Sequence, residues 1–243
     1  MKDYGIWIKP DCQFPFCSQA DFVRPWLPEI SFFDDIVPHT AAVNMAVDEA
    51  LLGVITGPVL RVYRWVRPAI SFGYFERWKP IRAAHPDRDA VRRWTGGGVV
   101  LHGEDFTYSL LIPSGWDTEA PRPADSYGII HGALCRALRD AGIPAEAASS
   151  SGAKISQACF ENPVPHDVMV NGRKVAGAAQ RRTRAGMMHQ GSVHGVELPD
   201  GFAEAFAARL GGAVRREAFE VIPAAEKLAA EKYGTRAWTE RRL

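Results

Sequence analysis

The chain has little of several features that would place it in a special class. Its 243 residues include only 4 cysteines, too few for a disulfide-stabilised scaffold in a chain of this length. No apolar run reaches the roughly 18 residues that a membrane-spanning helix needs. Neither sign of charge is in excess, because 29 basic and 28 acidic residues give a formal net charge of +1. This balance argues against non-specific nucleic-acid binding.

The N-terminal segment lacks the uninterrupted apolar stretch of an export signal, because Asp3, Pro10 and Asp11 fall where that stretch would lie. We therefore expect a cytoplasmic protein that acts away from membranes. Cys12 and Cys17 have no second pair of ligands nearby, so no metal site is expected. Hydrophobic residues make up 47% of the chain, which is typical of a globular domain with a full-sized core.

The first part of the chain shows little periodicity. Residues 1–38 are rich in proline and aromatic residues, and we interpret them as an irregular segment packed on the surface. Residues 1–25 are treated as an N-terminal extension, and one domain is expected over 26–243. Thr40 stands at an N-cap position before 41–54, where apolar residues recur at helical spacing.

Turn residues divide the rest of the chain into short β-prone runs and helices. Asn171 and Gly172 between two such runs predict a hairpin. This mixture predicts an α+β fold with a mixed, mainly antiparallel sheet packed with helices. The expected strands include 60–66, 69–75, 90–95, 99–103 and 106–113, and the later helices cover 126–142, 199–210 and 223–233.

The first chemically informative motif is RRWTGGGVVLH at 92–102. Three successive glycines lose much backbone entropy on folding. They usually occur where backbone N–H groups approach a ligand closely. Arg92 and Arg93 would add positive charge for a carboxylate or phosphate. The alternative is a glycine-rich hairpin turn without a ligand.

The second motif is GRKVAGAAQR at 172–181, in a chain where only 7 of the 29 basic residues are lysine. Lys174 follows the predicted hairpin turn, and small residues after it, Gly177 and Ala179 among them, would let a ligand lie against the strand. A lysine there can neutralise a phosphate or polarise a carbonyl. The alternative is a solvated hairpin lysine.

Two cysteines are read differently. Cys135 stands between apolar residues of the predicted 126–142 helix and fits an inert buried thiol. Cys159 stands in a polar loop ahead of Lys174, where a nearby ammonium would favour the thiolate. On the helices, His131 is expected to be partly exposed, and Asp48 and Glu49 to support the glycine-rich loop or cap backbone groups.

Taken together, six segments resemble the biotin/lipoate protein ligase catalytic fold, above all its lipoate-protein ligase A and octanoyltransferase branch. The resemblance covers roughly 26–235. The segments are NMAVDEALL (44–52), RVYRW (61–65), PAISFGYFE (68–76), RRWTGGGVVLHGEDFTYS (92–109), KVAGAAQRR (174–182) and HQGS (189–192).

The resemblance implies an enzyme that attaches an octanoyl or lipoyl chain to one lysine of a lipoyl domain. An acyl-carrier protein would be the donor, and a lipoyl domain or the glycine cleavage H protein the acceptor. Cys159 matches the cysteine of the A-C-F loop in cysteine-dependent octanoyltransferases and would carry the acyl group, with Lys174 as its catalytic partner. The implied substrate-binding residues are Arg92, Arg93, Thr95, Gly96, Gly97, Gly98, His102, Gly177 and Ala179.

Two other functions stay open. An ATP-dependent lipoate ligase would use ATP and Mg²⁺ and form an acyl-adenylate, whereas the transferase needs no cofactor because its thioester donor is already activated. The segment HGEDFTYS at 102–109 lacks the asparagine usual in such ligases, and about 50 residues follow the HQG block, fewer than a typical further domain has. The third possibility is a non-catalytic homologue that only binds acylated protein.

Overall fold

A computed structural model describes residues 25–116, 122–149 and 164–241. Within these ranges eight strands form one sheet, in the order β11-β1-β2-β6-β10-β9-β8-β7. The strands are β1 (Leu27–His39), β2 (Val59–Trp65), β6 (Phe106–Pro113), β7 (Ala145–Ala147), β8 (Val168–Val170), β9 (Arg173–Thr183), β10 (Gly186–Val193) and β11 (Gly211–Arg216).

Most neighbouring strands of this sheet run antiparallel. β1 is the exception, because it pairs in parallel with both β2 and β11. The antiparallel part runs from β2 through β6 and β10 to β9, β8 and β7. The β8–β9 hairpin turns at Asn171 and Gly172, whose φ angles are 49° and 74°. These positive values explain why this dipeptide is a reliable hairpin signal.

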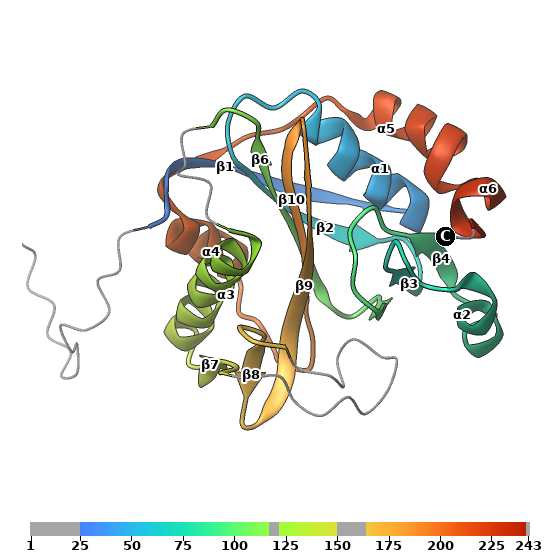
Figure 1. Cartoon of the computed structure of the whole chain (residues 1–243). Helices are drawn as coiled ribbons and strands as arrows, with labels where there is room; N and C mark the ends of the chain where they lie inside the picture. Colours follow the sequence, from blue (N-terminus) through green and yellow to red (C-terminus); the bar gives the residue numbers. More distant parts are fainter. Residues whose placement is uncertain (1–24, 117–121, 150–163, 242–243) are drawn as a thin grey trace, which may run out of the picture.

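Helices cover both faces of the large sheet (Figure 1). α1 and α5 pack on one face, and α3 and α4 pack on the other. The helical elements are α1 (Ala41–Leu52), α2 (Trp78–Ala84), α3 (Pro123–Asp140), α4 (Phe202–Leu210), α5 (Ile222–Leu228), the π-helical turn η3 (Ala229–Tyr233) and α6 (Arg236–Thr239).

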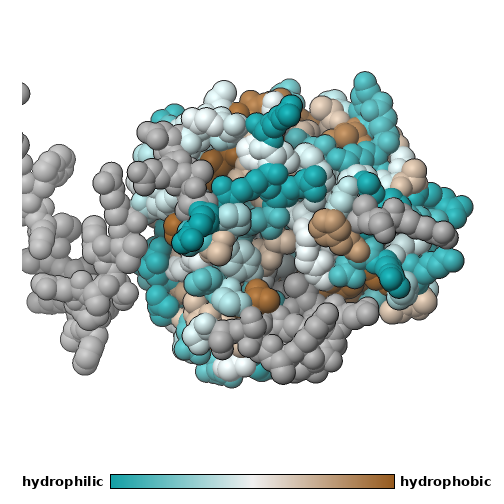
Figure 2. Space-filling view, in the orientation of Figure 1, coloured by the Kyte–Doolittle hydropathy of each residue, from teal (hydrophilic) through white to brown (hydrophobic). Residues whose placement is uncertain are grey.

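Successive side chains of a strand point to opposite faces of the sheet, so each strand contributes to two hydrophobic cores. Phe32 and Leu110 point towards α3 and α4, whereas Phe33 and Leu111, one residue further on, point towards α1 and α5. Burial of each such side chain stabilises the fold by about 1.5–3 kcal/mol. The face shown in Figure 2 is mostly hydrophilic or neutral, with hydrophobic side chains in separate patches.

A second, three-stranded sheet lies beside the first and carries the glycine-rich loop. Its order is β4-β3-β5, with β3 (Ala69–Phe72), β4 (Asp89–Arg92) and β5 (Val99–His102). β3 pairs in parallel with β4 and antiparallel with β5. The loop between β4 and β5, residues 93–98, therefore emerges at the edge of this small sheet and faces the large one.

The expected α+β class with its mainly antiparallel sheet is confirmed, and so is the strand at 106–113. Thr40 caps α1 as expected, since its hydroxyl accepts a hydrogen bond from the Val43 amide. Other bounds were too long: the 41–54 helix ends at Leu52, and the 69–75 strand ends at Phe72.

The interpretation of residues 1–38 as irregular is wrong for its second part. Residues 27–39 form β1, a central strand of the large sheet. Both faces of β1 are covered by helices, so apolar residues occur on both and the sequence shows no alternation of period two. Residues 1–24 lie outside the described residues.

Candidate active site

A narrow pocket opens between the two sheets. Small or apolar groups make up much of its wall, and a few polar side chains point into it. It is lined by Met45 of α1, Tyr63 of β2, Ser71 of β3, Arg93, Gly97, Val100 and His102 around the glycine-rich loop, Thr107 of β6, Gly177, Ala178 and Ala179 of β9, and Gln190, Gly191 and Ser192 of β10. The structure thus brings the two sequence motifs together in one cavity.

Arg93 holds the glycine-rich loop in shape. Its Nη2 donates to the carbonyl oxygens of Gly96 and Gly98, each at 2.9 Å, and its Nη1 donates to Ser71 Oγ at 2.8 Å. Gly97, between those two carbonyls, has a φ of 82°, a conformation that favours glycine. A Cβ at Gly97 would also lie 3.3 Å from Arg93 Nη2, so the loop and the guanidinium fit closely.

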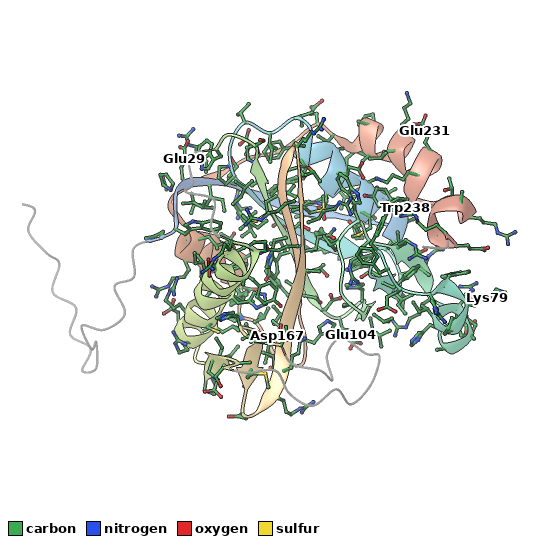
Figure 3. The ribbon with its side chains drawn as sticks, viewed as in Figure 1. Glu29, Lys79, Glu104, Asp167, Glu231 and Trp238 are labelled. Atoms are coloured by element: carbon green, nitrogen blue, oxygen red, sulfur yellow. The ribbon has the colours of Figure 1, made fainter. Side chains whose placement is uncertain are left out.

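Arg92 points away from this pocket. Its guanidinium donates to the carbonyl oxygens of Tyr74 and Glu76 at 2.7 and 2.8 Å, and to the carbonyl oxygen of Thr239, the last residue of α6, at 2.8 Å. Trp238 returns a hydrogen bond from its indole N–H to the Arg92 carbonyl. Arg92 therefore fastens the C-terminal helix α6 beside the small sheet, where Trp238 is labelled in Figure 3.

Thr95 connects the loop to a buried polar network. Its hydroxyl donates to Gln190 Oε1 at 2.8 Å, and Gln190 Nε2 donates to Asp48 Oδ2 at 2.7 Å. Ser109 Oγ donates to the same carboxylate oxygen at 2.6 Å. Asp48 of α1 is thus linked to the glycine-rich loop through the side chain of Gln190. This agrees with the predicted role of Asp48 in supporting the loop.

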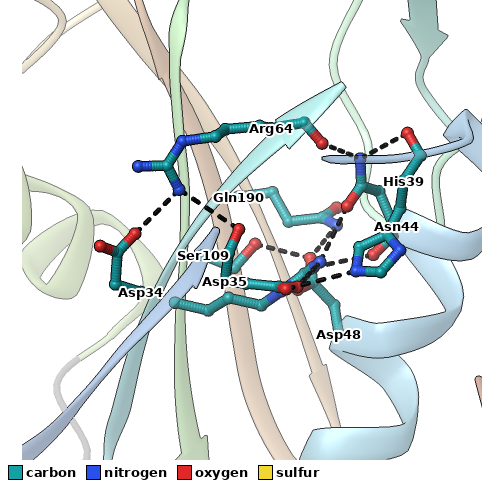
Figure 4. Close-up of polar contacts among 9 residues, drawn as sticks. Asp34, Asp35, His39, Asn44, Asp48, Arg64, Ser109 and Gln190 are labelled. Atoms are coloured by element: carbon teal, nitrogen blue, oxygen red, sulfur yellow. Dashed lines mark hydrogen bonds and ion pairs between the residues drawn. The ribbon is translucent and has the colours of Figure 1, made fainter. Parts of the chain in front are cut away.

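Arg61 is the centre of this network, in which Figure 4 labels Asp35, Asn44, Asp48, Ser109 and Gln190. It is fully buried and bridges Asp35 and Asp48, at 2.7 and 2.8 Å. Its Nη2 also donates to Asn44 Oδ1 at 2.8 Å. Burial lowers the pKa of Arg61, but the two carboxylates outweigh this effect and raise it overall, so the guanidinium stays charged. The network joins β1, β2, α1, β6 and β10 beneath the pocket.

His102 is held from both ring nitrogens. Its Nε2 lies 2.6 Å from Ser71 Oγ, and its Nδ1 lies 2.7 Å from Asp105 Oδ2. The ring stacks on Trp65 with centroids 4.1 Å apart. Burial lowers the pKa of His102 in spite of the hydrogen bond to Asp105. The imidazole is therefore neutral near neutral pH and fixed in orientation.

Lys174 forms a buried ion pair at the other side of the pocket. Its Nζ lies 2.8 Å from Asp167 Oδ2, and Asp167 also accepts hydrogen bonds from the Tyr127 hydroxyl at 2.6 Å and the Val164 amide at 2.8 Å. The Tyr127 oxygen in turn accepts from the Ala178 amide at 3.0 Å. Asp167 is labelled beside β8 and β9 in Figure 3. Lys174 is thus a fixed cation, not a solvated hairpin lysine.

Gly177 makes room for this lysine. A Cβ at position 177 would lie 2.7 Å from Lys174 Cε and 2.8 Å from Nζ, closer than real contacts allow. Since Gly177 also lines the pocket, the lysine ammonium and the pocket share a wall. On its other side Lys174 borders a surface groove whose apolar wall comes from Val99, Leu101, Val170, Val175 and Val196.

Several residues of this site did not stand out in the sequence. Asp167 was detectable, because the predicted hairpin at 171–172 brings the residues before β8 back towards β9. Ser71 and Asp105 carried no signal, since a single serine in a strand and an aspartate in a turn are common. Gln190 stood in the HQGS segment at 189–192, but no role was assigned to it.

Two predictions about single residues, Cys135 and His131, can be compared with the structure. A third, about Cys159, cannot. Cys135 is buried as expected, and burial raises its pKa to about 11. His131 was expected to be partly exposed, which is wrong: it is fully buried beneath the sheet, with Nδ1 2.7 Å from the His166 carbonyl oxygen. Cys159 lies outside the described residues, so its position relative to Lys174 stays a prediction.

Lipoate-protein ligases of known structure share this fold. Lipoate-protein ligase A bound with ATP superposes with a TM-score of 0.70 at 19% identity, over 88% of this chain and 100% of that one. A bipartite lipoate protein ligase from Thermoplasma acidophilum, solved with its E2 lipoyl domain, has a TM-score of 0.59 at 19% identity, over 88% of this chain and 97% of that one. At this identity the likeness shows the fold alone.

Within the described ranges, no helix is both long and apolar enough to cross a membrane.

Sequence relatives are closer. The octanoyltransferase LipM of Oceanobacillus iheyensis is 35% identical over 171 residues, which cover 66% of this chain and 62% of that protein. The LipM of Kyrpidia tusciae is 36% identical over 174 residues, which cover 63% and 62%. The chain thus spans about three-fifths of the length of these relatives. The family model for the lipoyl protein ligase A/B catalytic domain matches residues 40–196, which include the pocket, the glycine-rich loop and the lysine hairpin. The chain belongs to the lipoyl protein ligase A/B catalytic-domain family.

Proposed function

We propose that the protein is a cytoplasmic acyltransferase that moves an octanoyl or lipoyl group from an acyl-carrier-protein thioester to one lysine of a lipoyl domain or of the glycine cleavage H protein. The observation that carries this proposal is the buried pair of Lys174 and Asp167, 2.8 Å apart, at the wall of a pocket closed by the glycine-rich loop. The names of the relatives, octanoyltransferases, support the same chemistry.

We place the acyl carbonyl group at this pocket. Gly97, Gly177 and Ala179 leave space against the strands, and the nearest cations are Arg93 and Lys174. In the proposed first step the Cys159 thiolate attacks the thioester carbonyl, the acyl group moves to Cys159, and the carrier thiol leaves. The ammonium of Lys174 favours the thiolate and stabilises the negative oxygen of the tetrahedral intermediate.

In the second step the acceptor lysine amine attacks the acyl-cysteine and forms an amide, which releases the thiol. Backbone N–H groups of Gly96, Gly97 and Gly98 are the proposed oxyanion donors. Arg93 keeps this loop in position through the carbonyls of Gly96 and Gly98. Loss of one such donor typically costs about 10²–10³ in rate. No ATP is needed, because the thioester supplies the driving force.

The test uses the purified protein, octanoyl-loaded acyl-carrier protein and a lipoyl domain. Intact mass spectrometry is expected to show an octanoyl adduct on the protein, and then on the lipoyl domain. Cys159→Ala is expected to abolish both adducts, and Lys174→Met to slow both steps. An adduct that survives Cys159→Ala would refute the nucleophile. Pyrophosphate release that depends on ATP and free lipoate, with no thioester use, would identify a ligase instead.

A further inference from the structure

Three residues that meet at the pocket have the arrangement of a serine nucleophile and its base. Ser71 Oγ lies 2.6 Å from His102 Nε2, and His102 Nδ1 lies 2.7 Å from Asp105 Oδ2. The order hydroxyl, imidazole, carboxylate is the one that activates serine in acyl-transfer enzymes on unrelated folds. The proposed transferase reaction uses neither Ser71 nor Asp105.

The neighbouring hydrogen bonds fix the direction of this chain. Arg93 Nη1 donates to Ser71 Oγ at 2.8 Å, so the hydroxyl hydrogen is free to point at His102 Nε2. Nε2 is then the acceptor, and Nδ1 carries the hydrogen that is donated to Asp105. Asp105 also accepts from the hydroxyls of Thr107 and Ser192 at 2.7 and 2.6 Å. His102 therefore has the tautomer that a general base needs.

Electrostatics keep the three groups in the required protonation states. Burial lowers the pKa of His102, so the ring is neutral and able to accept a proton. Burial alone would raise the pKa of Asp105, but hydrogen bonds from His102, Ser192 and the Gly103 amide hold it well below its usual range. A neutral imidazole between a hydroxyl and a carboxylate is the resting state of a serine nucleophile.

The hydroxyl borders the pocket between the two sheets. Ser71 and His102 line the same pocket as Gly97, Gly177 and Ala179. Arg93, 2.8 Å from the hydroxyl oxygen, would stabilise negative charge as the serine attacks.

We propose that Ser71, His102 and Asp105 form a second acyl-accepting centre, which hydrolyses activated acyl esters and thioesters. Ser71 Oγ bonds to the acyl carbonyl carbon while its proton passes to His102 Nε2. The bond from that carbon to the leaving oxygen or sulfur breaks, and the leaving group takes the proton from His102. Water then attacks the acyl-serine, with His102 again accepting and returning the proton, which releases the carboxylic acid and restores Ser71.

A fluorophosphonate with an octyl chain tests this centre on the full chain. Such a probe bonds to an activated serine oxygen as its fluoride leaves, and peptide mass spectrometry locates the label. Labelling of the wild-type protein is expected on Ser71. Ser71→Ala is expected to abolish the label and, when combined with Cys159→Ala, the hydrolysis of p-nitrophenyl octanoate. Asp105→Asn is expected to slow both by up to about 10⁴-fold, because the imidazole loses its tautomer. Ser31→Ala, at a serine on β1 that donates to Glu217, is the matched control and is expected to label fully.

The outcomes separate this proposal from the proposed transferase. A wild-type protein that transfers octanoyl groups to a lipoyl domain but carries no label on Ser71 overturns only the serine centre. A protein that is labelled on Ser71 but transfers nothing overturns only the transferase. Ester hydrolysis by Cys159→Ala that persists when Ser71→Ala is added also overturns the serine centre. Because the label is mapped on the wild-type protein, the result stands even if a variant fails to fold.

Discussion

The Nζ atom of Lys174 lies 2.8 Å from Oδ2 of Asp167, and the two side chains are 3% and 0% exposed. A buried ion pair adds little net stability compared with apolar residues of the same shape, because both charges lose their hydration. It does fix the position of the ammonium. We therefore regard the pair as a device that holds Lys174 at the pocket wall.

Asp167→Asn is expected to reduce the free energy of unfolding by about 3–5 kcal/mol, because it leaves the buried ammonium without this counter-charge. Urea denaturation measures the loss. The double variant with Lys174→Met as well is expected to regain much of it, since the charge is then gone. A double variant as unstable as Asp167→Asn would show that the pair does not account for the loss.

Gly177→Ala tests whether octanoyl transfer depends on the position of Lys174, because it is expected to move this side chain without unfolding the protein. The added Cβ would meet Lys174 Cε and Nζ at 2.7 and 2.8 Å, at the flexible end of that side chain. We expect the lysine to move while the backbone stays, with octanoyl transfer falling on the order of 10²-fold, as small misplacements of catalytic groups can do. Gly53→Ala is the control, since its nearest neighbour lies 3.4 Å away and its φ is −80°. Full transfer activity in Gly177→Ala would contradict the proposed role of the lysine.

Arg61→Met is expected to destabilise the protein by about 3–5 kcal/mol, because Asp35 and Asp48 would share a buried site without their cation. Arg61→Lys is expected to recover little, since one ammonium cannot reproduce a guanidinium that bridges two carboxylates. Chemical denaturation of both variants checks this. The exposed pair of Arg64 and Asp34 serves for comparison, and Arg64→Ala is expected to cost no more than about 1 kcal/mol.

Stability is expected to fall as the pH is lowered from 7.5 to 5. Burial lowers the pKa of His102, His131 and His189, to about 4 for His131. In the unfolded chain these groups titrate near pH 6.5, so below that value the unfolded state binds protons that the native state does not. Each histidine then contributes a slope of up to about 1.4 kcal/mol per pH unit. Urea denaturation across this range measures the slope, and His131→Gln is expected to reduce it. An unchanged slope in that variant would argue against a buried neutral His131.

The sequence predicted the parts of the fold that depend on local pattern. The capped helix after Thr40 and the hairpin at Asn171 and Gly172 follow from residues close together in the chain, and both are present. β1 was missed because it pairs only in parallel, with β2 beyond α1 and with the distant β11, and because both of its faces are buried. Parallel pairing leaves no turn signal and no alternation to detect.

The site shows the same division. The glycine-rich loop and the segment that begins with Lys174 were recognisable as motifs. The structure brings the loop and Gly177–Ala179 to one pocket, with Lys174 packed behind Gly177. Arg92 and Arg93 look equivalent in the sequence, but Arg93 lines the pocket whereas Arg92 faces the C-terminal helix. Side chains of adjacent residues in extended backbone point to opposite sides, so Arg92 and Arg93 contact different parts of the protein. The partnership of Ser71 with Asp105 needs a tertiary contact that no local pattern encodes.

The pairing of β1 with β11 has a consequence for biosynthesis. One long edge of β1 is paired by β2, whose residues follow soon after, but the other edge is completed by residues 211–216. During translation that edge, with its unpaired backbone N–H and C=O groups, stays available to other chains until residues 211–216 have emerged from the ribosome. We expect the nascent chain to be most prone to aggregation in this interval. Premature termination before residue 211 is expected to give an aggregation-prone product.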